Sequence, residues 1–248
     1  MMENNRFRIL YEDSDILVCV KPAGIASQTK KSGQQDMVSL LCNYLHEKGE
    51  APDIGLVHRL DQPVEGILVF GKHTKSTAAL NRQLTQGGFC KGYLAVTQGE
   101  MPAREGKLVD HLKKDGQRNL SVVASKDDPQ AKKAELFYEV LQTDAQSSPV
   151  QNLVKIRLLT GRHHQIRVQF SHLGTPLAGD TKYGVHKQPR QPDLRGLGLC
   201  ACELEFAHPV SKKRMRFTIV PSRPVFQPFF EVLESSARQA DTASFSKK

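Results

Sequence analysis

The chain has 248 residues, 39% apolar and 25% charged, which is typical of a soluble globular protein with one or two domains. Its 35 Lys and Arg outweigh 26 Asp and Glu, and the formal net charge of +9 favours a polyanionic partner such as RNA or DNA. No stretch approaches the roughly 20 apolar residues of a membrane span and no apolar signal core begins the chain, so we expect a cytoplasmic protein without membrane contact.

Strands and two helices are predicted in the first hundred residues. Short apolar runs bounded by turn signals predict strands, namely two within residues 6–20, one at 67–70 and one at 89–99. Apolar residues at helical spacing predict helices at 36–50 and 74–88. Asp36 is expected to cap the first helix, because its carboxylate can accept free N–H groups of the first turn.

The rest of the chain is predicted to be rich in strands. For the polar residues 101–133 we expect either a hairpin-rich surface excursion or a partly mobile loop. The elements expected after it are strands at 134–143 and 153–161, a short helix within 162–174, a loop at 184–199, and strands at 200–209 and 213–221. Strands outnumber helices without βαβ alternation, which favours an α+β fold with a large mixed or antiparallel sheet. We expect one domain over residues 1–235 and a polar, disordered tail over 236–248.

A charged segment, His58-Arg59-Leu60-Asp61, stands between two apolar runs. Charged groups are rarely placed deep in a fold unless they are paired. Asp61 is therefore either a turn former at the surface or a carboxylate held for chemistry. A nearby Arg lowers the pKa of an Asp and keeps it ionised, and an ionised carboxylate can act as a nucleophile or a base.

A second group of polar residues lies in "TGRHHQIRVQFSHLG", residues 160–174. In a helix, Arg167 and His164 share a face, which is either a solvated surface or part of a site. Arg162, just before the helix, is placed to help seat a phosphate. Tyr93, in the strand at 89–99, either packs within the sheet or stacks on a base.

Nothing in the sequence indicates a metal ion or a cofactor. The five Cys are odd in number and include no Cys-x-x-Cys pair, which is typical of reduced thiols. The sequence contains no His-Glu-x-x-His motif, no G-x-x-x-x-G-K-[ST] phosphate loop, and no G-x-G-x-x-G between a strand and a helix. We therefore expect no metal, no nucleotide cofactor and no dinucleotide.

The order of several motifs resembles that of the RluA-type RNA pseudouridine synthases. The matching segments are Y-E-D-x-x-I-L-V-x-x-K-P-x-G at 11–24, H-R-L-D at 58–61, K-x-Y-x-A at 91–95, T-G-R-x-H-Q-I-R at 160–167, P-x-x-G-D-x-x-Y-G at 176–184 and F-x-H-P at 206–209. The resemblance implies the pseudouridine synthase fold. It also implies isomerisation of uridine to pseudouridine in ribosomal or transfer RNA, with base flipping and without a cofactor or metal.

The resemblance further implies roles for single residues. Asp61 matches the catalytic aspartate, and Tyr93 matches the tyrosine that stacks on the target uracil. Arg167 matches the basic residue that pairs with the aspartate, and Arg59 matches the arginine that can fill the space of a flipped nucleotide. We count Ile166, in the same motif, with the substrate-binding residues. Weaker RNA contacts are expected from His58, Arg162 and His164.

The chain departs from the family pattern at three points. Val64 and Glu65 replace a Thr-Ser pair, and we expect Glu65 to face solvent or to pair with a Lys or Arg, because an inward carboxylate would raise the pKa of Asp61. Cys200 replaces a His in the late strand. The motifs begin at once, without the S4 RNA-binding domain of many relatives, so we expect a monomer that selects RNA through its catalytic domain and loops.

Two other interpretations remain at this point. An RNA chaperone on the same fold would bind and flip a base without isomerising it, and the change at Val64 and Glu65 keeps that possibility open. An unrelated hydrolase would use Asp61 with His58 or His164 and would act without RNA. The sequence does not identify the RNA or the uridine. It also does not decide whether Asp61 attacks C1′ or removes the proton on C2′.

Overall fold

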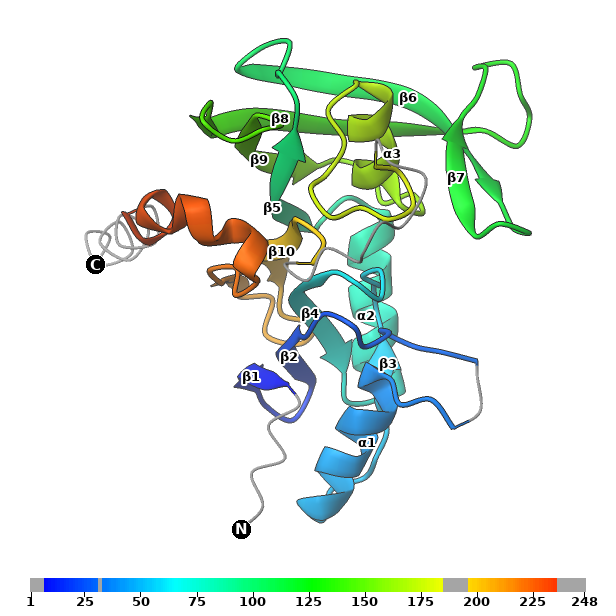
Figure 1. Cartoon of the computed structure of the whole chain (residues 1–248). Coiled ribbons are helices and arrows are strands. Elements are labelled where there is room, and N and C mark those ends of the chain that lie inside the picture. The colour runs from blue at the N-terminus through cyan, green and yellow to red at the C-terminus, as the bar shows by residue number, and fades with distance from the viewer. Residues whose placement is uncertain (1–6, 31–32, 185–195, 236–248) are drawn as a thin grey trace. The chain divides into compact units, whose positions relative to one another are not determined.

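The computed structural model describes residues 7–30, 33–184 and 196–235 (Figure 1). The chain divides into two compact units, one built from residues 1–91 and 201–219, the other from 92–200 and 220–248. Eleven strands, three α-helices and one 3-10 helix lie in the described part. Every strand pair whose register is defined is antiparallel. The predicted α+β fold with a large sheet is confirmed.

The first unit combines two helices with six strands of the sheet. Its elements are β1 (Arg8–Glu12), β2 (Ile16–Lys21), α1 (Met37–Glu47), β3 (Gly55–Leu56), β4 (Glu65–Gly71), α2 (Thr74–Thr85), most of β10 (Leu199–Ala207) and β11 (Arg214–Thr218). The strand order is β1-β2-β4-β10, with β3 on β4 and β11 on β10. All seven residues of β4 are buried, because its apolar side chains pack on both faces.

Local sequence signals explain the first unit's turns and helix starts. The carboxylate of Asp13 accepts the N–H groups of Asp15 and Ile16 at 2.8 and 2.9 Å and so forms the β1–β2 turn. Asp36 caps α1 as predicted, with its carboxylate 2.8 Å from the N–H nitrogen of Ser39. Both predicted helices of this unit are confirmed.

The second unit is mainly sheet. Its elements are β5 (Cys90–Gln98), β6 (Glu105–Asp115), β7 (Leu120–Val123), β8 (Lys132–Asp144), β9 (Gln151–Leu158), α3 (Gln165–His172) and the 3-10 helix η1 (Pro224–Phe229). The strand order is β5-β9-β8-β6-β7. For residues 101–133 the sequence left a hairpin or a mobile loop open, and the antiparallel pairing of β6 with β7 shows the hairpin. Tyr138 of β8 packs edge-on against Phe170 of α3, with ring centroids 5.9 Å apart, and anchors that helix to the sheet.

Three expectations concern residues outside the described part of the chain or are not tested by the structure. Most of the predicted loop at 184–199 and the whole tail at 236–248 lie outside the described residues. The single catalytic domain over residues 1–235 stays a prediction. Among the described residues, every helix is too short or too polar to span a lipid bilayer.

Candidate active site

Asp61 lies half-buried in the loop between β3 and β4 of the first unit. Hydrogen bonds hold its neighbours on both sides. The Ser27 hydroxyl accepts the N–H of Leu60 and donates to the carbonyl oxygen of Leu60, both at 3.0 Å. The N–H of Gly24 donates to the carbonyl oxygen of Gln62 at 2.8 Å, and the Gln62 side chain donates back to Gly24 at 2.9 Å. The backbone around the carboxylate is therefore fixed by the chain segment that follows β2.

Lys21 is a charged residue that sequence analysis did not single out. Its side chain is fully buried at the end of β2, and its ammonium donates to three backbone carbonyl oxygens, including those of Ile25 at 2.7 Å and Gln62 at 3.2 Å. Burial lowers the pKa of Lys21 to about 8, and the negative charges of Asp61 and Glu65 act against that shift. Lys21 thus places a cation beside the Asp61 loop and ties that loop to β2.

Glu65 is buried, with 4% of its surface exposed, so the expectation that it faces solvent is wrong. The physical reason is its place in β4, a strand buried along its whole length. The alternative expectation, pairing with a Lys or Arg, agrees with its charge acting on Lys21. Gly66 follows with φ +147°, and a Cβ there would lie 2.5 Å from Ala201, so only glycine fits.

His58 and Arg59 differ in their surroundings. Nε2 of half-buried His58 accepts the N–H of Val69 at 3.4 Å, and the His58 ring packs edge-on against Phe89. Burial, and to a smaller degree the Lys91 charge, lower the pKa of His58 to about 3. Its ring is therefore neutral near pH 7, and the predicted RNA contact would have to be uncharged. Arg59 is exposed and can reach solvent or a phosphate.

Acidification should destabilise the protein through His58. Its pKa of about 3 in the folded chain lies below the ordinary 6.5, so the unfolded chain binds this proton first. Stability therefore falls as the pH drops from about 6.5 towards about 3. We expect His58→Asn to reduce the slope of unfolding free energy against pH by up to about 1.4 kcal/mol per pH unit in that window.

Urea titrations at several pH values measure this slope. The same change at His46, on the exposed side of α1, controls for loss of an imidazole at the surface. Equal slopes for wild type and His58→Asn between about pH 4 and 6.5 would contradict a depressed pKa.

In the second unit, a buried ion pair holds Arg167 of α3. Its guanidinium donates to both carboxylate oxygens of Asp180, at 2.8 and 2.7 Å, and the two side chains are 4% and 0% exposed. The Asp180 carboxylate also accepts the N–H groups of Lys182 and Tyr183 at 2.9 and 3.1 Å. Asp180 is thus an orienting partner of Arg167 that sequence analysis missed. The signal was present as the Asp of the quoted P-x-x-G-D-x-x-Y-G pattern.

His164 begins α3 with a left-handed backbone, φ 52°, and is 8% exposed. The Tyr183 hydroxyl accepts the N–H of Ser121 at 2.7 Å and lies 2.8 Å from Nδ1 of His164, to which it can donate its proton. A left-handed conformation is costly for a residue with a Cβ and persists only where surrounding contacts hold it. The surrounding contacts therefore hold the backbone of His164 in this conformation, just before the helix that carries Arg167.

The remaining predicted residues of the second unit differ in exposure. Tyr93 in β5 and Ile166 in α3 are buried, with 8% and 5% exposed. Arg162 is exposed, but its N–H donates to the Gln165 side chain at 3.0 Å and its Nε to the carbonyl oxygen of Lys133 at 2.9 Å. Two of the Arg162 groups that were expected to bind a phosphate therefore already donate hydrogen bonds to protein oxygens.

The predicted site residues thus form two described groups. The first unit contains Asp61, its neighbours Arg59 and His58, and residues 21–27, which hydrogen-bond to the Asp61 loop. The second unit holds Tyr93 and the residues of the T-G-R-x-H-Q-I-R motif. In the first unit, hydrogen bonds join residues 21–27 to Leu60 and Gln62 on either side of Asp61. In the second unit, Tyr183 and Asp180 link His164 to Arg167.

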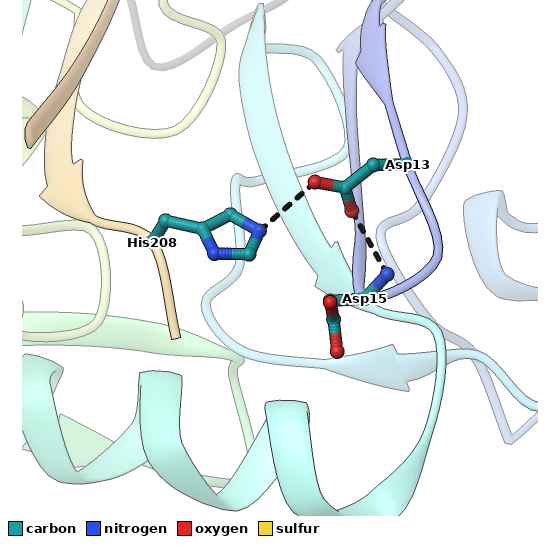
Figure 2. A group of neighbouring side chains, drawn as sticks. All are labelled: Asp13, Asp15 and His208. Atoms are coloured by element: carbon teal, nitrogen blue, oxygen red, sulfur yellow. Dashed lines mark hydrogen bonds and ion pairs between the residues drawn. The ribbon is translucent and has the colours of Figure 1, made fainter. Parts of the chain in front are cut away.

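One set of potential metal ligands, Asp13, Asp15 and His208, gathers in the first unit (Figure 2). Nδ1 of His208 accepts the N–H groups of Val210 and Ser211 at 3.3 and 3.1 Å, which puts the ring proton on Nε2. Nε2 then donates to the carboxylate of Asp13 at 2.9 Å. With both ring nitrogens engaged, this cluster ties the end of β10 to the β1–β2 turn and is poorly suited to a metal ion.

Comparison with known proteins gives one family. The sequence profile described as RNA pseudouridylate synthase matches residues 15–172. RNA pseudouridine synthase YhcT of Bacillus subtilis, itself uncharacterised, is 32% identical over 210 residues, which is 84% of this chain and 67% of that protein. Ribosomal large subunit pseudouridine synthase C of Escherichia coli is 32% identical over 217 residues, 84% of this chain and 64% of that protein. The chain therefore spans about two thirds of the length of these relatives.

A solved structure shares the fold. Human RNA Pseudouridylate Synthase Domain Containing 4 superposes with a TM-score of 0.70, covering 89% of this chain and 92% of that one, at 20% sequence identity. At this level of identity the likeness concerns the fold alone, and it agrees with the fold expected from the motif order.

Proposed function

This chain belongs to the RNA pseudouridylate synthase family and is an enzyme of the isomerase class, and on that premise we propose that Asp61 acts on the ribose of a uridine in ribosomal or transfer RNA. The observation that carries the proposal is the clamped loop on which Asp61 lies. A catalytic carboxylate has to be held within a fraction of an ångström of its productive position, and a fixed backbone supplies that.

The proposed reaction needs no added atoms. The bond from C1′ to N1 of uracil breaks, a bond from C1′ to C5 forms, the C5 proton leaves and N1 gains a proton. Asp61 either attacks C1′ or removes the proton on C2′, and both routes require it to be ionised. The negative charge of Asp61 acts on the buried Lys21 and opposes the fall of the Lys21 pKa, so the two charged groups lie close enough to interact.

The other predicted residues have roles that suit their chemistry. Tyr93 would stack on the target uracil, a contact worth about 1–3 kcal/mol, and Ile166 would add apolar contact in the same pocket. Arg167, held by Asp180, would supply the positive charge that the family motif provides for the catalytic aspartate. The formal net charge of +9 supports salt-dependent binding of RNA, with weaker contacts from His58, Arg162 and His164. A monomeric state and a cytoplasmic location are part of this proposal.

Tritium release tests the proposed function directly. RNA carrying tritium at C5 of uridine is incubated with the full chain in EDTA, without any cofactor, and released tritium is counted. We expect release that depends on enzyme concentration. Binding of the same RNA without any release would overturn the isomerase proposal and favour an RNA chaperone on this fold.

Arg59→Ala should weaken turnover on structured RNA more than on a flexible loop. If Arg59 fills the gap left by a flipped nucleotide, its loss matters most where the base leaves a stack. We expect kcat/KM to fall about tenfold or more on a stem substrate and about threefold or less on an unpaired loop. Arg82→Ala, on the exposed face of α2, is the matched control for loss of one surface cation. Equal losses on both substrates would contradict the role.

A further inference from the structure

We propose that Ser27 is a positioning residue for Asp61, an inference that rests on the proposed function and extends it to a residue outside every family motif quoted above. Ser27 is 2% exposed and lies 33 positions before Leu60 in the sequence. Its hydroxyl both donates to the carbonyl oxygen and accepts from the N–H of Leu60, at 3.0 Å each. One buried side chain thereby satisfies both backbone groups of the residue preceding Asp61.

The peptide planes around Asp61 explain why this contact matters. The carbonyl oxygen of Leu60 lies in the rigid plane that also contains the Cα of Asp61. The carbonyl oxygen of Asp61 lies in the next plane and accepts the N–H of Val64 at 3.0 Å. Ser27 therefore fixes the plane before the carboxylate-bearing carbon, and Val64 fixes the plane after it. Only the side-chain torsions of Asp61 remain to be set.

The backbone groups of Leu60 could not replace the Ser27 hydroxyl with another partner unless the loop moved. Leu60 is 8% exposed, so its N–H and carbonyl oxygen have little access to water. Without the hydroxyl, both groups would be buried without partners, and the loop would have to shift to reach new ones. A shift of about 1 Å at a reacting group can cost about a hundredfold in rate.

Ser76 provides a matched control in the same unit. It is 1% exposed at the start of α2, and its hydroxyl contacts Asp15 and the ring of His73. Its loss removes a buried serine hydroxyl, as Ser27→Ala does, but touches no residue of the Asp61 loop. A general loss of stability would affect both variants alike.

The experiment compares wild type, Ser27→Ala, Ser27→Thr, Ser27→Cys and Ser76→Ala as full chains. Steady-state tritium release gives kcat and KM, and amide hydrogen exchange follows the N–H of Leu60. We expect Ser27→Ala to lower kcat about tenfold to a hundredfold with KM within about twofold. Ser27→Thr, which keeps the hydroxyl, should recover most of kcat, and the weaker thiol donor should give an intermediate value. The Leu60 amide should exchange faster in Ser27→Ala and as in wild type in Ser76→Ala.

Two results would overturn the inference. One is a kcat for Ser27→Ala within about twofold of wild type, and the other is an equal loss in Ser76→Ala, which would mean that stability alone is at work. If wild type itself releases no tritium, the proposed function fails. The hydrogen-exchange rate of the Leu60 amide then still tests the positioning role. An equal rate in wild type and Ser27→Ala would reject that role.

Discussion

Asp61→Asn is expected to reduce tritium release to less than about a thousandth of the wild-type rate while leaving RNA affinity within about tenfold. The carboxamide is nearly isosteric, so the loop held by Ser27 and Gly24 should keep its conformation. It is neither a useful nucleophile nor a base at neutral pH, so both chemical routes lose their acting group. RNA binding draws mainly on cations spread over the surface and should change little.

Single-turnover tritium release and filter binding at fixed salt measure the two effects. Asp53→Asn, in an exposed segment of the same unit, controls for the loss of one negative charge. Turnover of Asp61→Asn near the wild-type level would remove Asp61 from the reaction. Loss of RNA binding in parallel with turnover would indicate a role in affinity instead.

Asp180→Ala is expected to lower the free energy of unfolding by about 3–5 kcal/mol. The change strands the buried guanidinium of Arg167 without its bidentate partner. It also leaves the N–H groups of Lys182 and Tyr183 without the carboxylate oxygen that they share. An uncompensated buried charge costs more than the intact pair contributes, because desolvation of the cation is no longer offset.

Urea unfolding at constant pH measures this loss. The double variant Arg167→Met with Asp180→Leu should recover a large part of it, since it removes the stranded charge and fills the space with apolar atoms. Asp128→Ala, which breaks the more exposed pair with Lys113, should cost far less stability than Asp180→Ala, because water screens that pair. A loss below about 1 kcal/mol in Asp180→Ala would mean that water or another group reaches Arg167.

The sequence predicts the elements well because their signals are local. The cap at Asp36 and the β1–β2 turn depend on residues within four positions of one another. The two-residue strand β3 carries no such signal, since it exists only by pairing with β4. The 3-10 helix η1 was also missed, because two Pro residues in six argue against a regular helix.

In the candidate site, too, the sequence reveals local motifs but not contacts between residues far apart in the chain. Asp61 and Arg167 are candidates through motif order, and each stays a prediction: Asp61 is half-buried in the first unit and Arg167 is buried in the second. Ser27 and Asp180 act on residues 33 and 13 positions away, through contacts that only the folded chain creates. The expectation that Glu65 faces solvent is wrong because the sequence does not reveal that Glu65 is buried, nor that its charge acts on Lys21 of the neighbouring strand β2.

The discontinuity of the first unit has a consequence during synthesis. Strand β4 neighbours β10, and the His208–Asp13 contact joins the two ends of this unit, yet β10 emerges from the ribosome about 130 residues after β4. At typical rates of translation the apolar edge of β4 waits on the order of ten seconds for its partner. The nascent N-terminal half therefore exposes an unpaired strand edge, which favours aggregation until β10 has been synthesised.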